Sequence, residues 1–348
     1  MNDQERAGSS RPGDLGAEVV AEIRAREFRD VEVRELDRGF ACAPLGVTQE
    51  VWSDPPIDNR GVACWRVHVR TRALKGFDGS PFQLRALSSL ISRSALSALV
   101  RDANEPRRLL LASSLHVNAG NREWASRLLG LVVRLQLSEA EQFGRASAFL
   151  ETGIVADVPD VDSARRATLI DAGPVDVTES SQFTDANPSD VADIAETLAA
   201  LQDVWNLHAV RTPRGVIARV PCPDAWSGDE DILIEIEAKS HNRLGLGLAV
   251  SLSVPGWADV SDALAFAEAE IASGCRNDLL GSWSVEGVIL THRSFFPVFI
   301  VTKAVVLHVA TAAARRALWL DLGPGIVRRD GLGLDQPTRR RLRRFPSQ

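Results

Sequence analysis

The sequence predicts an α+β fold in which one order of elements occurs twice. Runs of predicted strands are separated by single helices, which favours the α+β class over a doubly wound parallel sheet. The chain has 348 residues, a length that predicts two domains of roughly 100–200 residues each. Each half has the order helix, strand run, helix, strand or hairpin, long helix, although the halves share no visible sequence identity.

The composition is typical of a soluble protein without an extended basic surface. Hydrophobic residues make up 45% of the chain and charged residues 25%, which are ordinary values for a globular protein. The formal net charge of −6 excludes a polycation that binds nucleic acid over its whole surface. The longest apolar stretch, residues 295–320, contains Lys303 and two arginines and is a better core helix than a membrane span. We therefore expect a cytoplasmic protein without membrane contact.

The first domain is expected at residues 17–150, after a polar leader at 1–16 that has the composition of a disordered segment. Helical spacing of apolar residues predicts helices at 17–29, at 82–100 and from Asn121 onward. Strands are expected at 31–36, 39–43, 47–52, 62–71 and 107–117. The clearest strand is 62–71, where Cys64, Arg66, His68 and Arg70 alternate with apolar side chains, as a half-buried strand requires.

An acidic stretch rich in Gly and Pro, residues 151–187, is the expected linker to a second domain at 188–322. In that domain we expect strands at 204–210, 215–220, 231–237, 246–254, 279–285 and 288–292, and helices from 187, at 259–273 and at 299–320. The dipeptide Glu286-Gly287 is suited to a tight hairpin turn between the last two strands. Residues 323–348 are expected to form a flexible, arginine-rich tail.

One pattern resembles a metal-dependent nuclease. Pro223-Asp224 and Glu237-Ala238-Lys239 match the permissive PD-(D/E)xK pattern, in which the two carboxylates hold Mg²⁺ and the lysine steadies water or phosphate. Chance matches to this pattern are common. The alternative interpretation is an ordinary surface strand, with Glu235 and Glu237 facing water and Ile232, Ile234 and Ile236 facing the core.

Other chemistry-bearing motifs do not occur in the sequence. The six histidines never fall into H-x-x-x-H or H-E-x-x-H spacing, and neither a nucleophile elbow nor a phosphate loop is found. The four cysteines lie far apart without a C-x-x-C pair, and Cys64 in its strand is expected to be a small buried or half-buried side chain rather than a nucleophile. We therefore expect no catalytic residues, no metal and no cofactor.

The candidate functional residues are ones that could contact a partner. Trp226 and Trp257 fall in predicted loops, where a large apolar ring is costly unless it is covered. The polar face of strand 62–71 is a further candidate. The tail contains a cluster of arginines that could contact nucleic acid, an anionic surface or an acidic partner: Arg340, Arg341, Arg343 and Arg344. A solvated tail without a partner is at least as good an interpretation.

Scattered motifs in both halves resemble the TY-Chap proteins of actinobacteria, which are similar to type III secretion chaperones and YbjN-type domains. In the first half the resemblance rests on residues 112–117, Asn121, Trp124, Arg127-Leu128 and Gln136. In the second half it rests on residues 244–248, Leu252, Pro255, 280–283, 294–297 and 315–319. Together these motifs cover most of residues 17–150 and 188–320.

The resemblance implies a helix–antiparallel twisted sheet–helix domain present twice, and a chain that is either a monomer imitating a dimer internally or a homodimer. It also implies binding of a polypeptide segment and carries no catalytic residues. We therefore expect a non-enzymatic, chaperone-like adaptor whose partner is another protein or peptide. Nucleic acid is expected to bind, if at all, only through the tail. The competing hypothesis is a Mg²⁺-dependent nuclease that uses Asp224, Glu237 and Lys239.

Overall fold

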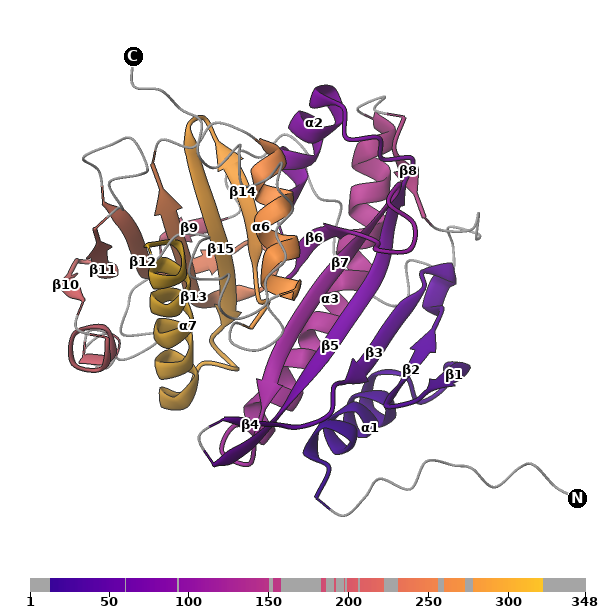
Figure 1. Cartoon of the computed structure of the whole chain (residues 1–348), viewed down its shortest axis with the longest axis horizontal. Coiled ribbons are helices and arrows are strands. Elements are labelled where there is room, and N and C mark those ends of the chain that lie inside the picture. Colours follow the sequence, from indigo (N-terminus) through magenta and orange to yellow (C-terminus); the bar gives the residue numbers. More distant parts are fainter. Residues whose placement is uncertain are drawn as a thin grey trace, which may run out of the picture.

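The computed structural model describes residues 13–59, 61–92, 94–149, 153–157, 183–185, 191, 197, 199–205, 207–221, 231–255, 260–272 and 278–321. Most of the expected leader and linker, and the whole tail, lie outside these ranges. The described residues form two antiparallel sheets with several helices (Figure 1). The predicted α+β class is therefore confirmed.

The first half contributes an antiparallel sheet with the strand order β1-β2-β3-β5-β7-β6. Its strands are β1 (Val33–Leu36), β2 (Gly39–Cys42), β3 (Gln49–Ser53), β5 (Val62–Lys75), β6 (Ala98–Arg101) and β7 (Arg108–Val117), with β4 (Ile57–Asn59) and β8 (Val155–Ala156) paired to the ends of β5. The helices are α1 (Leu15–Glu27), α2 (Pro81–Ile91) and α3 (Arg122–Phe149). A short 3-10 turn covers Pro44–Gly46.

The second half contributes another antiparallel sheet, with the strand order β10-β11-β12-β13-β15-β14. Its strands are β10 (His208–Arg211), β11 (Gly215–Val220), β12 (Ile232–His241), β13 (Gly245–Val254), β14 (Ser282–Glu286) and β15 (Ile289–Pro297), with β9 (Phe183–Asp185) paired to the end of β12. Helices α6 (Val260–Ala272) and α7 (Lys303–Asp321) and a π-helical turn at Ala200–Val204 complete the described part.

Strand β5 shows how the sequence determines the two faces of the first sheet. Val67 and Val69 belong to the buried core, and the hydroxyl of Thr71 donates to Gln136 of α3. Because side chains alternate along a strand, Arg66, His68, Arg70 and Arg72 lie on the opposite face. We call that face, which lies away from α1 and α3, the outer face of the first sheet.

The prediction of one long helix at 82–100 is wrong in its second half. Helix α2 ends at Ile91, and residues 98–101 form strand β6, which pairs with β7. Leu96 and Leu99 are three residues apart, as are Leu84 and Leu87, but the backbone of β6 has its hydrogen-bond partners on the neighbouring strand β7. Tertiary pairing overrides a local pattern that contains neither Gly nor Pro at this point.

The predicted turn between the last two strands is confirmed. Gly287 follows β14 with a φ of +63°, a left-handed conformation that favours glycine. Strand β15 runs on to Pro297, five residues beyond the predicted end at 292, and α7 begins at Lys303 rather than at 299. None of the helices in the described part of the chain has the length and apolar character needed to cross a bilayer.

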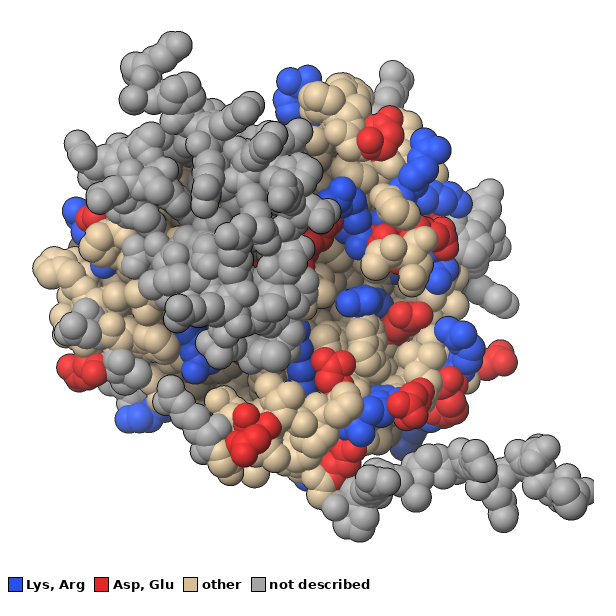
Figure 2. Space-filling view, viewed as in Figure 1, with Lys and Arg blue, Asp and Glu red and all other residues tan. Residues whose placement is uncertain are grey.

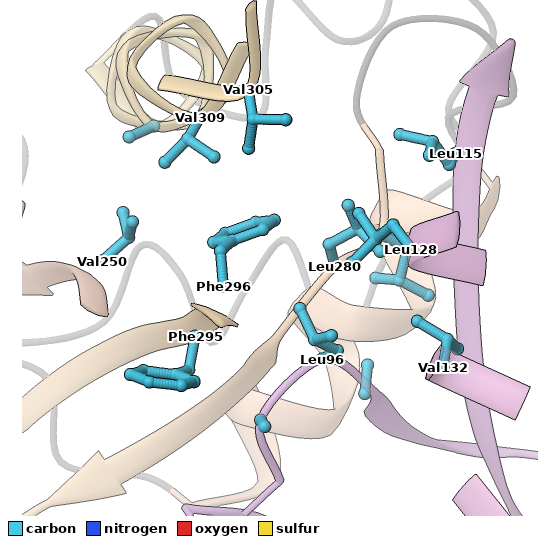
Figure 3. Close-up of a cluster of buried hydrophobic side chains, with 14 of the residues drawn as sticks. Leu96, Leu115, Leu128, Val132, Val250, Leu280, Phe295, Phe296, Val305 and Val309 are labelled. Atoms are coloured by element: carbon cyan, nitrogen blue, oxygen red, sulfur yellow. The ribbon is translucent and has the colours of Figure 1, made fainter. Parts of the chain in front are cut away.

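The two halves share one hydrophobic core. Leu96, Leu115 and Leu128 of the first half belong to the same buried cluster as Leu280 and Phe296 of the second (Figure 3). Helix α6 packs against β6, and α2 packs against β14, so each half lays its short helix on the edge strand of the other (Figure 1). The halves are therefore joined by packing as well as by the chain between them.

Backbone hydrogen bonds also cross between the halves. Ser114 of β7 and Leu279 exchange two N–H···O bonds of 2.9 Å each. The N–H of Phe295 in β15 donates to the carbonyl of Ala95 at 2.9 Å. These bonds fix the position of one sheet against the other, because buried backbone groups must be paired.

Candidate functional site

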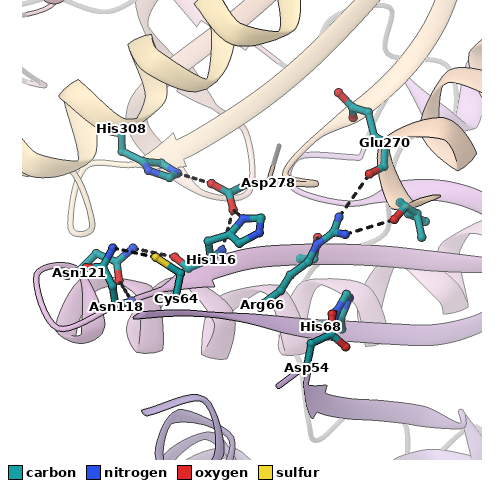
Figure 4. Close-up of polar contacts among 12 residues, drawn as sticks. Asp54, Cys64, Arg66, His68, His116, Asn118, Asn121, Glu270, Asp278 and His308 are labelled. Atoms are coloured by element: carbon teal, nitrogen blue, oxygen red, sulfur yellow. Dashed lines mark hydrogen bonds and ion pairs between the residues drawn. The ribbon is translucent and has the colours of Figure 1, made fainter. Parts of the chain in front are cut away.

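Ionisable side chains gather where the two sheets meet. We call this group the junction cluster: His116, Asp278, His308, Arg66 and Glu270, which Figure 4 shows, and Arg316, which bonds to Glu270 and to the backbone of Asp278. The residues come from β5, β7, α6, α7 and the segment before β14. Charged groups removed from water are costly unless they are paired. The junction cluster is therefore a candidate functional site.

The carboxylate of Asp278 lies between two imidazoles in Figure 4. Nδ1 of His116 is 2.8 Å from Oδ1, and the backbone N–H of His116 donates to the same oxygen at 2.6 Å. Nε2 of His308 is 2.9 Å from Oδ2. Burial on its own would raise the pKa of Asp278, but its interactions with the two imidazoles outweigh burial and hold that pKa well below its usual range. Asp278 is thus an ionised group at the centre of the junction.

A second chain of contacts runs from β5 to α7. Nε of Arg66 donates to the hydroxyl of Ser114, and its two other nitrogens donate to the backbone carbonyls of Glu270 and Ile271 at the end of α6. The Glu270 carboxylate, which is fully buried, accepts from Nε of Arg316 at 2.5 Å. Arg316 also donates to the backbone carbonyl of Asp278. Arg66, expected on a polar strand face, is therefore used to hold α6 against the first sheet.

Cys64 lies beside this cluster and is buried, as predicted. Its sulfur is 3.9 Å from the amide nitrogen of Asn118, a weak contact. The neighbouring Asn121 precedes α3, and its side chain donates to the carbonyl of His116 at 2.7 Å. The arrangement places a thiol near an imidazole–carboxylate pair, but the described contacts of Cys64 involve an amide rather than a base.

A buried carboxylate on α3 forms another contact between the halves. Glu139 accepts from the hydroxyl of Ser94 at 2.9 Å and from the backbone N–H of Ala95 at 3.2 Å. Arg243, from the turn between β12 and β13, approaches it and donates to Gln142 and Ser138 on the same helix. Burial raises the pKa of Glu139 to about 7, although the hydrogen bonds and the charge of Arg243 oppose the shift.

The outer face of the first sheet carries an aromatic group that is partly open to solvent. Trp52 of β3 stacks on His68 with ring centroids 4.7 Å apart, and the guanidinium carbon of Arg70 lies 4.8 Å from the indole centroid. Nε2 of His68 is 2.8 Å from a carboxylate oxygen of Asp54. That hydrogen bond lowers the pKa of Asp54, and burial lowers the pKa of His68. We call Trp52, His68, Arg70 and Asp54 the outer-face cluster.

The structure tests only part of the predicted site. Glu237 and Lys239 lie on one side of β12, with Nζ of Lys239 3.0 Å from the Glu237 carboxylate. Ile232, Ile234 and Ile236 are buried, as the surface-strand interpretation requires, whereas Glu235 and Glu237 are only partly exposed. Outside the described residues lie Asp224, Trp226, Trp257, Arg340, Arg341, Arg343 and Arg344.

Over the described ranges, no group of three or more His, Cys, Asp or Glu side chains is arranged to hold a metal ion. Comparison of the chain with protein-family models, with curated proteins and with solved structures finds no match. The case for a function therefore rests on the geometry of the chain itself.

Sequence reasoning did not find the residues that join the halves. Glu270 lies in the apolar sequence of α6, and a carboxylate in such a sequence is a signal of a buried, paired group. It is paired with Arg316 in the structure. Asp278, Glu139 and Arg243 carry no local signal. Apart from contacts within their own turn or helix, their partners are 30 or more residues away in the sequence. Trp52 was expected in a strand, but its stacking partners lie on β5.

Removal of the Asp278 carboxylate should destabilise the whole protein. In Asp278→Ala the backbone N–H and the imidazole of His116 lose their acceptor, and His308 loses the carboxylate 2.9 Å from its Nε2. We therefore expect the free energy of unfolding to fall by about 3–5 kcal/mol. Asp231→Ala is the matched control, because Asp231 forms only an exposed contact with Arg219 at 3.9 Å and should cost less than about 0.5 kcal/mol. Equal effects in urea denaturation would contradict this role of Asp278.

Glu139 should make stability depend on pH. The folded pKa of about 7 lies above the ordinary value of 4.5, so its stabilising contribution is complete below pH 4.5 and is lost as the pH rises through 7. Glu139→Gln keeps a neutral side chain at every pH. We expect this variant to match the wild type near pH 4.5 and to exceed its unfolding free energy by about 3 kcal/mol at pH 8.

The control for this experiment is Glu141→Gln on the same helix, whose partner Arg145 is exposed. It should change the unfolding free energy by less than about 0.5 kcal/mol at either pH. A stability difference between wild type and Glu139→Gln that is the same at both pH values would show that Glu139 does not titrate as described.

Proposed function

We propose that the protein is a non-enzymatic, chaperone-like adaptor that binds a polypeptide client, built from two tandem copies of one helix–sheet–helix domain. The observation that carries this proposal is the way the halves meet. Their contacts are reciprocal. Helices α1 and α3 both pack on the inner face of the first sheet, so the partly exposed Glu50 and Trp52 of β3 lie on its outer face.

The strand orders support the tandem arrangement. Both six-strand paths have a meander of four strands followed by a hairpin whose second strand pairs with the fourth strand of the meander. In each half a helix precedes that hairpin, and a long helix follows it. When β6 is matched to β14, Ala98 corresponds to Ser282. Ala98 pairs with Ala112 of β7 and Ser282 pairs with Arg293 of β15, so Ala112 corresponds to Arg293.

With this matching, contacts between the halves occur in exchanged pairs. Ala95 corresponds to Leu279, and Ser114 corresponds to Phe295. The Ser114–Leu279 and Phe295–Ala95 hydrogen bonds are then the same contact with the halves exchanged. Likewise, Ser88 of α2 donates to the Val285 carbonyl of β14, and Glu268 of α6 accepts from Arg101 of β6. Such reciprocity is a property of a two-fold interface and supports an internal pseudo-dimer.

The partners of the buried ionisable groups support binding rather than catalysis. Asp278, Glu270 and Arg316 have each other, histidines or backbone groups as partners, so their chemistry is used to hold the halves together. The outer-face cluster differs, because Trp52 and Arg70 are only partly buried and lie on a sheet face. Tryptophan and arginine are among the residues enriched at the binding hot spots of protein–protein interfaces.

The nuclease hypothesis retains one favourable observation. Glu237 and Lys239 are adjacent on β12, as a metal-dependent nuclease would need. Cleavage of supercoiled DNA in the presence of Mg²⁺, lost in Glu237→Ala, would favour this function over the adaptor. Lack of cleavage by the wild type would leave the Glu237–Lys239 pair as a surface ion pair of a strand.

Site-specific photo-crosslinking tests the adaptor function. A photoreactive residue is placed at Arg34, which is exposed on β1, or at Arg127, which is exposed on α3 as a matched control. In cells of the source organism, position 34 should form a defined adduct with a protein, and position 127 should not. Equal labelling at the two positions, or adducts at neither, would contradict client binding at the outer face.

A further inference from the structure

The outer face of the first sheet carries arginines that the described carboxylates of the same face do not pair. Arg66, His68, Arg70 and Arg72 follow one another along this face of β5, and Trp52 and Glu50 lie beside them on β3. Helix α6 covers the end of the face near β6, where it contacts Arg66. Figure 2 shows basic and acidic side chains interspersed over the remainder.

Each acidic group near Arg70 already has another partner, a histidine for Asp54 and an arginine for Glu50 and for Asp102. Asp54 bonds to His68, Glu50 lies 3.9 Å from Arg34, and Asp102 lies 3.9 Å from Arg108. In the described part of the chain, neither Arg70 nor Arg72 has a carboxylate within ion-pair distance. The nearest described partner of the Arg70 guanidinium is the face of Trp52.

The loss of water around the Arg70 guanidinium is only partly compensated by the nearby carboxylates. Burial lowers the pKa of Arg70, and the attraction of Glu50, Asp102 and Asp54 only partly opposes this shift. A guanidinium that has lost water without gaining an acceptor is stabilised when a carboxylate arrives, because it presents two parallel N–H donors. The Trp52 ring next to it holds the guanidinium in place from one side.

We propose that this face binds an acidic peptide segment, with its carboxylates on Arg70 and Arg72 and an apolar or aromatic side chain on Trp52. The proposal rests on the proposed adaptor function and names the surface and the chemistry of the client. Alternate side chains of an extended segment lie about 7 Å apart. That spacing matches the separation of Arg70 and Arg72, which are alternate residues on one strand.

The charges on the face favour a peptide over a nucleic acid. A polynucleotide carries a negative charge on every phosphate, and its backbone would meet Glu50, Asp54 and Asp102 as well as the arginines. A peptide can place one or two carboxylates at the guanidinium groups and neutral side chains elsewhere. The mixture of signs therefore selects for discrete acidic residues.

Selection from a random peptide library tests the proposal without knowledge of the client. Randomised 12-residue peptides displayed on phage are selected on the full chain, and the output is sequenced. We expect enrichment of peptides that combine Asp or Glu with an aromatic or large aliphatic residue. The selected peptides, made synthetically with a fluorescent label, should bind Arg70→Gln/Arg72→Gln about 10-fold more weakly or worse.

The matched control is Arg219→Gln, an exposed arginine of the second sheet, which should bind the peptides as the wild type does. Circular dichroism and thermal unfolding of each variant show that it is folded. Enrichment of basic or uncharged peptides, unchanged binding by the double variant, or tighter binding of a 12-nucleotide single strand than of any selected peptide would overturn the proposal. So would a selection that enriches nothing.

The outcomes separate this proposal from the adaptor function. If photo-crosslinking at position 34 captures a protein and Arg70→Gln/Arg72→Gln does not reduce the adduct, the adaptor function stands and the acidic-peptide surface fails. If position 34 captures nothing, the adaptor function itself fails at this face.

Discussion

The arrangement of this molecule depends on the backbone hydrogen bonds by which Ser114 of β7 and Leu279 join the two sheets. Ser114 and Leu279 are both buried, so water cannot replace a lost hydrogen-bond partner of their backbone groups. Once the bridge is made, α6 lies against β6, α2 lies against β14, and the leucines of α3 meet the phenylalanines of β15 in one core.

Polar groups at the junction follow from this packing. Asp278 and Glu270 are carried into the interior by the segment before β14 and by α6, and each is matched by a cation or an imidazole from a different element. Buried ion pairs contribute little net stability compared with apolar residues of similar size, but the loss of one partner is costly. We interpret the junction cluster as a device that specifies how the halves fit together.

Much of the fold was predictable because its signals are local. The alternation along β5, the turn at Gly287 and the apolar faces of α3 and α7 each lie within a short window of sequence. The sequence of β6 predicts a helix, but the segment is a strand because it pairs with β7. The sequence predicts the polar face of β5 but not the partners of its side chains or the junction cluster, since Trp52 meets His68 and Asp278 meets His116 only after the sheets have formed.

Hydrogen exchange of individual backbone amides tests the central claim most directly, because it measures the free energy needed to open each bond. If the halves form one unit, the amides of Ser114, Leu279 and Phe295 should exchange only through global unfolding, with the same free energy as amides in the middle of β5 and β13. Exchange of these three amides through a lower-energy opening, while β5 and β13 stay protected, would show that the halves are separable domains in loose contact.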